Sequence, residues 1–341
     1  MNFVDPSDIR PILVLSALSS KPVSIKSSTQ FSIQEQQFLN IVSALTSNST
    51  SKLQNNAHYI DFIPGMPQGG TYKFNVDNIA FIAEYLLLLC PFCKFSSEIE
   101  LTGEIISNQV SSIFYIKEVL AHHLKYFNNG EDFVDIKIGQ NSTKLIFKTV
   151  QKFNTVAFTQ ISPVKSIQGT AVYQNVPKQL SNRVITSSKQ ILLPFTSDVS
   201  VAQFLSKSQS QSLGLFLFAE MENGGRVGGE FFFESNLEPE DIGKIAAQLL
   251  LREIEGNGAI DANAQAVILM ALAMSEGLVS VVRFQDLCDL SIELMRTVFE
   301  ILGVIFQVEN YEILGENGIV VKGVEIVVRG SGMVNVTKRG F

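Results

Sequence analysis

The sequence has 341 residues, of which 46% are apolar and 17% are charged, with 26 Lys and Arg against 33 Asp and Glu. This apolar content excludes an intrinsically disordered chain, and the net charge of −7 excludes a nucleic-acid binder that is cationic over its whole surface. Three cysteines are too few for a disulfide framework, so we expect a soluble protein of a reducing, intracellular compartment. The most apolar stretch, residues 79–92, contains Glu84 and is too short to span a membrane.

Hydrophobic periodicity predicts one order of elements three times. The first unit has a helix (8–18), a strand (23–25), a helix (32–46) and strands at 58–63 and 71–76. The second has a helix (77–89), a strand (98–101), a helix (109–127) and strands at 133–138 and 144–149. The third has a helix (262–275), a strand (279–283), a helix (288–302) and strands at 304–309 and 319–328. The units therefore start near residues 8, 77 and 262.

About a hundred extra residues separate the second unit from the third and predict a small α/β module. They contain a strand (167–173), a helix (177–192), a strand (198–201), a hairpin of strands 213–221 and 226–233, and a helix (239–255). We expect an α/β (α+β) fold of three repeated units, each with two helices and a four-stranded sheet, with the α/β insert domain before the third repeat. The predicted division is 1–160 for core repeats 1 and 2, 161–258 for the insert, and 259–341 for core repeat 3.

The cysteines and histidines offer no metal or redox site. Cys90 and Cys93 form a CxxC pair, but the pair follows a run of leucines and precedes a strand, so we expect a buried helix-to-strand turn. A zinc site needs a second pair of ligands, which Cys288 alone does not supply. His122 and His123 are adjacent on a helix and point about 100° apart, so they do not readily share a metal, and we expect ordinary hydrogen-bonded histidines.

Short strings follow one another along nearly the whole chain. They include Val14-Leu15-Ser16, Lys21-Pro22-Val23, Pro64-Gly65-Met66-Pro67, Ile167-Gln168-Gly169, Pro239-Glu240-Asp241 and Gly258-Ala259-Ile260-Asp261. Their order, together with three units and an insert, resembles the RNA 3′-terminal phosphate cyclase superfamily.

The resemblance implies a nucleotide pocket that has lost its nucleophile. True cyclases of that superfamily hold a nucleotide covalently on a histidine, and the resemblance places this position at Leu287. No histidine follows His123 in the sequence. The residues implied to line the vestigial pocket are Asp261, Asn263, Gln265 and Leu287, with no cofactor and no catalytic residue.

The chain resembles more closely the cyclase-like, non-cyclase branch of the superfamily. This resemblance implies a nucleolar factor that is required for early pre-18S rRNA processing in the small-subunit processome. The implied partners are a ribosome-biogenesis GTPase, other processome proteins and pre-rRNA, without DNA or membrane. Candidate contacts to RNA phosphates are Arg296 and Arg283.

A catalytic role in RNA cleavage is the main alternative. Some members of the branch carry Arg-Asp-x-Lys in the last helix, whereas this chain has Arg296-Thr297-Val298-Phe299 and keeps only the arginine. A guanidinium without a metal-binding carboxylate or a general base does not cleave a phosphodiester. We therefore expect a non-catalytic scaffold, with a pre-rRNA endonuclease as the alternative and a cyclase with relocated residues as a third option. A partner site is expected to show as an apolar patch on the insert or the sheet rim.

Overall fold

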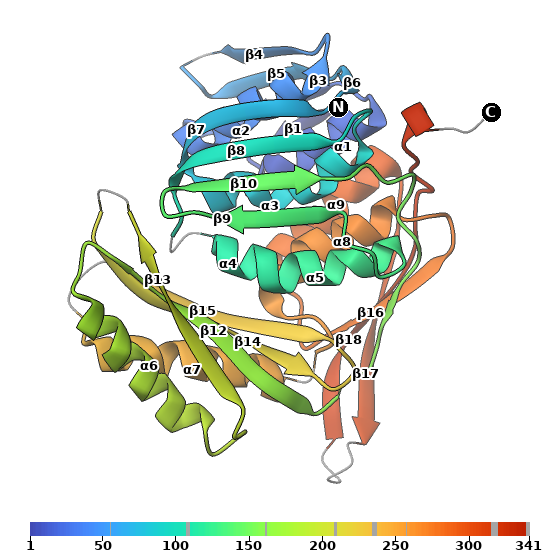
Figure 1. Ribbon diagram of the computed structural model, residues 1–341. Helices are drawn as coiled ribbons and strands as arrows, with labels where there is room; N and C mark the ends of the chain where they lie inside the picture. The colour runs from blue at the N-terminus through green and yellow to red at the C-terminus, as the bar shows by residue number, and fades with distance from the viewer. Residues whose placement is uncertain are drawn as a thin grey trace.

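Three four-stranded sheets of the computed structural model share one pattern of pairing (Figure 1). The structure describes residues 1–54, 56–106, 110–160, 162–207, 210–233, 237–256, 258–314 and 320–338. Across the first sheet the order is β1 (Asn2–Val4), β2 (Val23–Lys26), β5 (Tyr59–Ile63) and β4 (Thr50–Gln54). The second has β7 (Gly70–Asn78), β8 (Ser97–Glu104), β10 (Ser142–Phe147) and β9 (Val134–Ile138), and the third has β11 (Ala157–Phe158), β16 (Val279–Phe284), β18 (Val320–Arg329) and β17 (Phe306–Leu314). In each sheet the first two strands are parallel and the other neighbours are antiparallel.

Two helical segments connect the strands of each sheet. They are α1 (Arg10–Ser19) and α2 (Ile33–Leu45) in the first unit, α3 (Ile79–Leu89) in the second, and α8 (Gln265–Met274) and α9 (Asp289–Leu302) in the third. The other segment of the second unit joins α4 (Ile113–Tyr115), the π-helical η2 (Ile116–Leu120), α5 (Ala121–Leu124) and the 3₁₀-helical η3 (Lys125–Asn128). Further short elements are β3 (Thr46–Ser47), β6 (Met66–Pro67), and the 3₁₀ turns η1 (Cys90–Phe92), η4 (Ala262–Ala264) and η5 (Val336–Lys338). The predicted mixed α/β class is confirmed.

The assignment of strand 71–76 to the first unit is wrong. This strand, β7, pairs in parallel with β8, with Tyr72 opposite Ile99, and so begins the second sheet. Each unit therefore starts with a strand, which the sequence did not reveal for β1 and β11 because these strands are only three and two residues long. The first residues of the predicted helix 109–127 and strand 319–328 lie outside the described residues.

The insert is a four-stranded sheet with two helices on one face (Figure 1). The strand order is β13 (Val199–Ser206), β12 (Val164–Gln174), β14 (Ser212–Met221) and β15 (Arg226–Phe233), and the helices are α6 (Lys178–Leu192) and α7 (Pro239–Glu255). The opposite face carries Phe216, Phe218 and Phe232 into the main hydrophobic core.

The insert interrupts the third unit. β11 precedes the insert in the chain, yet it pairs in parallel with β16, which follows the insert. The insert therefore lies after the first strand of the third unit instead of ahead of the unit. The domain division at 160 and 258 stays a prediction, and residue 161 lies outside the described residues.

Local sequence signals explain several helix ends. Ser32 and Glu35 form a capping box at the start of α2. The side chain of Asn78 accepts the N–H of Phe81 at 3.1 Å and caps α3. The helix α3 is then buried on nearly every side, as its almost continuous apolar sequence predicts.

The CxxC pair lies in the predicted environment. Cys90 and Cys93 are buried at η1, between α3 and β8, and burial raises the pKa of Cys90 well above its ordinary value. A raised thiol pKa is the opposite of what a redox cysteine requires. In the part of the chain that the structure describes, no helix is long and apolar enough to cross a membrane.

Candidate functional site

A cavity of about 320 Å³ lies where helices of all three units meet. It is lined by Asp8, Arg10, Pro11, Glu84, Tyr85, Val110, Ser111, Ala262, Asn263, Ala266, Cys288, Leu290, Glu293, Leu294 and Thr297. The residues come from α1, α3, the segment before α4, η4, and the two helices of the third unit. Of the residues that the resemblance implies for a vestigial nucleotide pocket, Asn263 is in this lining, which also includes residues at the start of α9.

Arg10 is the one arginine among the described lining residues, and its charge is already balanced. It is 7% exposed, and its guanidinium contacts Asp8 at 2.7 Å and Glu84 at 2.8 Å. It also donates to the main-chain oxygen of Phe81 at 2.9 Å and lies over the Phe81 and Tyr85 rings. Burial alone lowers the pKa of Arg10, but the two carboxylates raise it above its ordinary value.

The described part of the lining carries more carboxyl groups than cations. Asp8 and Glu84 share Arg10, and the carboxylate of Glu293 accepts the N–H and the hydroxyl of Ser7. Burial raises the pKa of Glu84, an effect that Arg10 opposes. A nucleotide brings several negative charges, so this set of carboxyl groups opposes the binding of its phosphates.

Asp261 does not face the cavity as a free carboxylate. It is 2% exposed and accepts hydrogen bonds from the N–H of Gly228 at 2.8 Å, from the N–H of Ala264 at 3.0 Å, and from the hydroxyl of Tyr115. Burial raises the pKa of Asp261 to about 7. Asp261 therefore caps η4 and connects it by hydrogen bonds to Gly228 of the insert strand β15 and to Tyr115 of the second unit.

Gln265 fixes the entry to α9. Its Nε2 donates to the main-chain oxygen of Asp286 at 2.7 Å, and its Oε1 accepts the N–H of Cys288 at 3.2 Å and the hydroxyl of Ser291 at 2.9 Å. Leu287, in the same loop, packs against the main core. Of the four predicted pocket residues, Asn263 lines the cavity, while Asp261, Gln265 and Leu287 contact other parts of the protein.

The two candidate phosphate contacts, Arg283 and Arg296, differ in whether their guanidinium groups already have partners within the protein. Arg283, on β16, pairs with Glu325 at 2.7 Å, donates to the main-chain oxygen of Thr159 at 3.1 Å and lies over the Tyr311 ring. Arg296, on α9, is exposed and has no hydrogen bond or ion pair among the described residues. The geometry therefore leaves Arg296 accessible to a phosphate and engages Arg283 within the third sheet.

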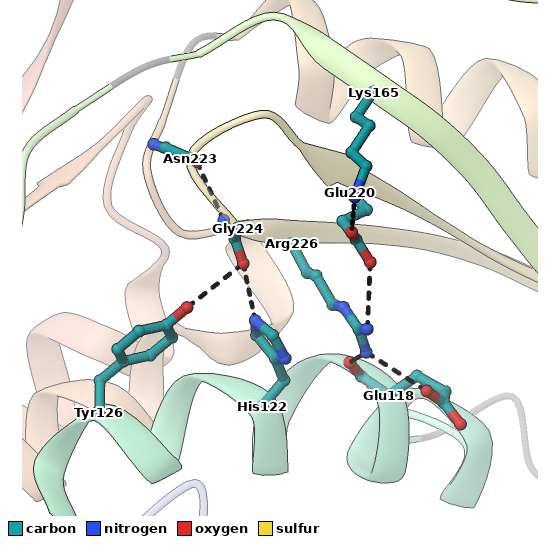
Figure 2. Close-up of polar contacts among 9 residues, drawn as sticks. Glu118, His122, Tyr126, Lys165, Glu220, Asn223, Gly224 and Arg226 are labelled. Atoms are coloured by element: carbon teal, nitrogen blue, oxygen red, sulfur yellow. Dashed lines mark hydrogen bonds and ion pairs between the residues drawn. The ribbon is translucent and has the colours of Figure 1, made fainter. Parts of the chain in front are cut away.

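The adjacent histidines His122 and His123 hold the insert against the second unit, and Figure 2 shows the contact of His122. Nε2 of His122 lies 2.7 Å from the main-chain oxygen of Gly224, and Nε2 of His123 lies 2.7 Å from that of Arg226. Burial lowers the pKa of His122 to about 4 and that of His123 to about 3. These are neutral, hydrogen-bonded histidines, as predicted, and within the described residues no group of three or more His, Cys, Asp or Glu is placed to hold a metal.

Arg226 extends the same interface (Figure 2). Its guanidinium donates to the main-chain oxygen of Glu118 at 2.8 Å and pairs with the Glu118 carboxylate at 3.3 Å. It also pairs with Glu220 at 3.2 Å, which in turn contacts Lys165 at 3.0 Å. The turn of the β14–β15 hairpin is thus bound to the second unit by charges as well as by histidines.

The charged residues of the cavity were missed in the sequence analysis, although two of them carry a signal. Glu84 interrupts the most apolar stretch of the chain, and Arg10 precedes Pro11 at the start of an apolar helix. A charge within an apolar helix is rarely buried without a partner, so the two residues together predict an ion pair. The sequence alone does not show that the partners lie on different units.

Comparison with known proteins shows similarity to RNA 3′-terminal phosphate cyclase-like proteins and to an rRNA processing protein. Residues 160–255 match the family model of the RNA 3′-terminal phosphate cyclase (RTC) insert domain. The RNA 3′-terminal phosphate cyclase-like protein of Mus musculus is 29% identical over 330 residues, covering 89% of this chain and 88% of that protein. The Homo sapiens protein of the same name is 27% identical with the same coverage. The rRNA processing protein rcl1 of Schizosaccharomyces pombe is 24% identical over 286 residues, covering 77% of this chain and 78% of that protein.

EPSP synthases are among the solved structures that align with this chain. EPSP synthase from Acinetobacter baumannii aligns with 96% of this chain and 65% of its own, at 9% identity and a TM-score of 0.32. This score is too low to bear on fold or function.

Proposed function

Because this chain belongs to the RNA 3′-terminal phosphate cyclase-like family, we propose that it is a ribosome-biogenesis factor that acts in ribosomal RNA processing. Its Schizosaccharomyces pombe relative is named an rRNA processing protein, and this name supports the assignment to ribosomal RNA processing. Within that process we assign it to early pre-18S maturation, as a member of the small-subunit processome in the nucleolus. The assignment follows from the resemblance of the chain to the ribosome-biogenesis branch.

We infer that the protein contributes binding surfaces instead of catalysis. The observation that carries this inference is the pairing of charges in the cavity. Arg10 already forms ion pairs with Asp8 and Glu84, so its charge is not available to a phosphate. The residue that the resemblance places at the nucleotidyl position, Leu287, has no nucleophilic atom. A fold that keeps the cavity but lines it with carboxylates supports a scaffold.

The proposed partners are a ribosome-biogenesis GTPase and pre-rRNA. Leu193 and Phe195, at the end of α6, are 51% and 50% exposed and support the insert as the protein-binding side. Arg296 supports a phosphate contact on α9. Depletion of the protein is expected to cause unprocessed pre-18S rRNA to accumulate, and re-expression to restore processing. Normal pre-18S processing after complete depletion would contradict the proposal.

The endonuclease alternative is tested directly through Arg296. We expect purified protein to leave a pre-rRNA fragment intact in the presence of Mg²⁺. The reason is that Thr297 and Phe299 stand where the family's motif has an aspartate and a lysine, so the motif here supplies no general base beside Arg296. Gel analysis of an end-labelled fragment measures cleavage, with Arg296→Ala as the comparison. Cleavage by the wild type that disappears in Arg296→Ala would establish the enzyme and overturn the scaffold.

A further inference from the structure

One end of the second sheet presents three lysines and an aromatic ring that the proposed function has not yet used. We call it the sheet-end surface and define it as Lys94, Phe95, Lys148 and Lys338. Lys94 and Phe95 lie just before β8 begins, and Lys148 lies just after β10 ends. Lys338 comes from η5, and hydrogen bonds from Asn335 and Lys338 hold this segment beside the same end of the sheet (Figure 1).

Hydrogen bonds hold these distant segments together. Nδ2 of Asn335 donates to the main-chain oxygen of Cys93 at 2.9 Å and so brings the C-terminal segment beside Lys94. Nζ of Lys338 donates to the main-chain oxygen of Thr149 at 3.0 Å, one residue from Lys148 along the chain. The lysines are therefore gathered by the fold, although they are dispersed in the sequence.

The lysine charges of the sheet-end surface are not balanced by ion pairs within the described residues. Lys148 is exposed, and its Nζ reaches only the main-chain oxygen of Asp132, at 3.5 Å. The neighbouring Lys152, in contrast, is neutralised by Glu276 and is left out of the surface for that reason. Unpaired ammonium groups bound to main-chain oxygens keep their positive charge available to an anionic partner.

Phe95 is exposed on a rigid support. Its side chain is 57% exposed, and Nζ of Lys94 lies 5.2 Å from the centroid of its ring. The N–H of Phe95 donates to the main-chain oxygen of Gln68 at 2.9 Å. Gly69, with φ of +72°, packs so closely beneath that a Cβ there would lie 2.2 Å from the main-chain oxygen of Phe95. An exposed ring on a fixed backbone loses little entropy when a planar group stacks on it.

We propose that the sheet-end surface binds single-stranded RNA, with a base stacked on Phe95 and neighbouring phosphates on the three lysines. The combination of an exposed aromatic ring with unpaired cations is the arrangement that single strands require, because only an unpaired base exposes its face to a side chain. The proposal rests on the proposed function for the identity of the RNA, which is pre-rRNA. It adds a second RNA contact, separate from Arg296 on α9.

The lysines are tested by the salt dependence of binding. The probe is a fluorescent, unstructured 12-nucleotide RNA, titrated with full-length protein at several salt concentrations. Each phosphate contact to a single strand contributes about −0.7 to the slope of log K against log salt concentration, so K94A/K148A/K338A is expected to reduce the slope by about 2. The matched control, K26A/K52A/K178A, removes three exposed lysines elsewhere and is expected to keep the wild-type slope.

The ring is tested separately. Phe95→Ala is expected to weaken binding on the order of tenfold without changing the salt slope, because stacking involves no phosphate. The matched control is Phe195→Ala, which removes a ring of similar exposure from the insert and is expected to bind like the wild type. All substituted side chains are exposed, and unchanged thermal unfolding verifies that each variant is folded.

The outcomes separate this inference from the proposed function. If the wild type does not bind the RNA at low salt, or binds it with an affinity that the lysine triple variant and Phe95→Ala leave unchanged, the surface is not an RNA site. Variants that keep RNA binding but lose a protein partner would likewise overturn the inference. The depletion experiment is independent of these results, so intact pre-18S processing after depletion would remove the proposed function and leave the measured RNA contact standing.

Discussion

At the scale of single residues, Arg10 shows how a cation that lines a cavity can already be paired within the protein. The guanidinium is enclosed by Asp8, Glu84 and the rings of Phe81 and Tyr85. A buried charge is tolerated only when its partners are fixed around it. The cation therefore serves the packing of α1 against α3, and it is not free to hold an anion.

Removing the Arg10 side chain takes the ion-pair partner away from two half-buried carboxylates, Asp8 and Glu84. We expect Arg10→Ala to lower the free energy of unfolding by about 3–5 kcal/mol, the usual cost of breaking a buried ion pair from one side. Arg296→Ala, the control on an exposed side chain, is expected to change it by about 0.5 kcal/mol or less. Urea unfolding followed by circular dichroism measures both. Equal stability of the two variants would show that Arg10 is not a buried structural cation.

At the scale of elements, periodicity predicted the long helices and the central strands, while very short strands escaped it. The helix predicted at 239–255 has the bounds of α7, because Pro239 and Gly256 mark both ends. The strand β11 has only two residues and exists because it pairs with β16, more than a hundred residues later. Pairing of this kind is a tertiary property, so no local pattern contains it.

The residues of the candidate site also fall into those that the sequence indicated and those that only tertiary packing brings to the cavity. The sequence and its resemblance indicated the loop before α9 and the start of α8, where Asn263 does line the cavity. They did not indicate Asp8 or Glu293, because these carboxylates reach the cavity only when the first unit packs on α9. Arg283 stays a predicted phosphate contact, and its pairing with Glu325 across β16 and β18 is a tertiary contact that the sequence did not indicate.

The contact between α5 and the β14–β15 hairpin predicts opposing effects of pH. His122 and His123 have lowered pKa values, so the unfolded chain takes up protons first and stability is lost as pH falls below about 6.5. Glu230, on β15, accepts the N–H of Ser112 at 2.8 Å and the hydroxyl of Ser112 at 2.5 Å. Burial raises the pKa of Asp261 to about 7, from 3.8, and that of Glu230 to about 7, from 4.5. Between these values the folded protein holds protons that the unfolded chain has released, so this contribution to stability is lost as pH rises from about 4 to about 7.

Neutral variants separate the two effects. We expect H122Q/H123Q to become more stable as pH falls from 7 to 5, because only the carboxyl groups then titrate. D261N/E230Q is expected to become less stable over the same range, and the wild type to change less than either. Urea unfolding at each pH gives the slopes. Slopes of the same sign in the two variants would contradict this account of the interface.

At the scale of the whole molecule, the insert sheet belongs to two hydrophobic cores. One face packs under α6 and α7, and the other delivers Phe216, Phe218 and Phe232 to the core that runs through all three units. The strand β14 is therefore buried on both faces over most of its length. A sheet shared in this way fixes the insert relative to the units, and the proposed scaffold role requires such a fixed arrangement of surfaces.

A double cut tests whether the insert depends on this shared core. Protease sites are placed after residues 160 and 256, and the cleaved protein is analysed by size-exclusion chromatography. We expect the freed segment to elute with the rest, because each phenylalanine buried in the main core contributes about 2 kcal/mol and the hairpin stays bound to α5. F216A/F218A removes two of these side chains and is expected to let the segment separate, whereas Phe195→Ala, on the exposed end of α6, is expected to leave it bound. Separation of the segment from the cleaved wild type would mean that the insert is an independent domain, and that its contacts with the units are too weak to fix the arrangement of the scaffold.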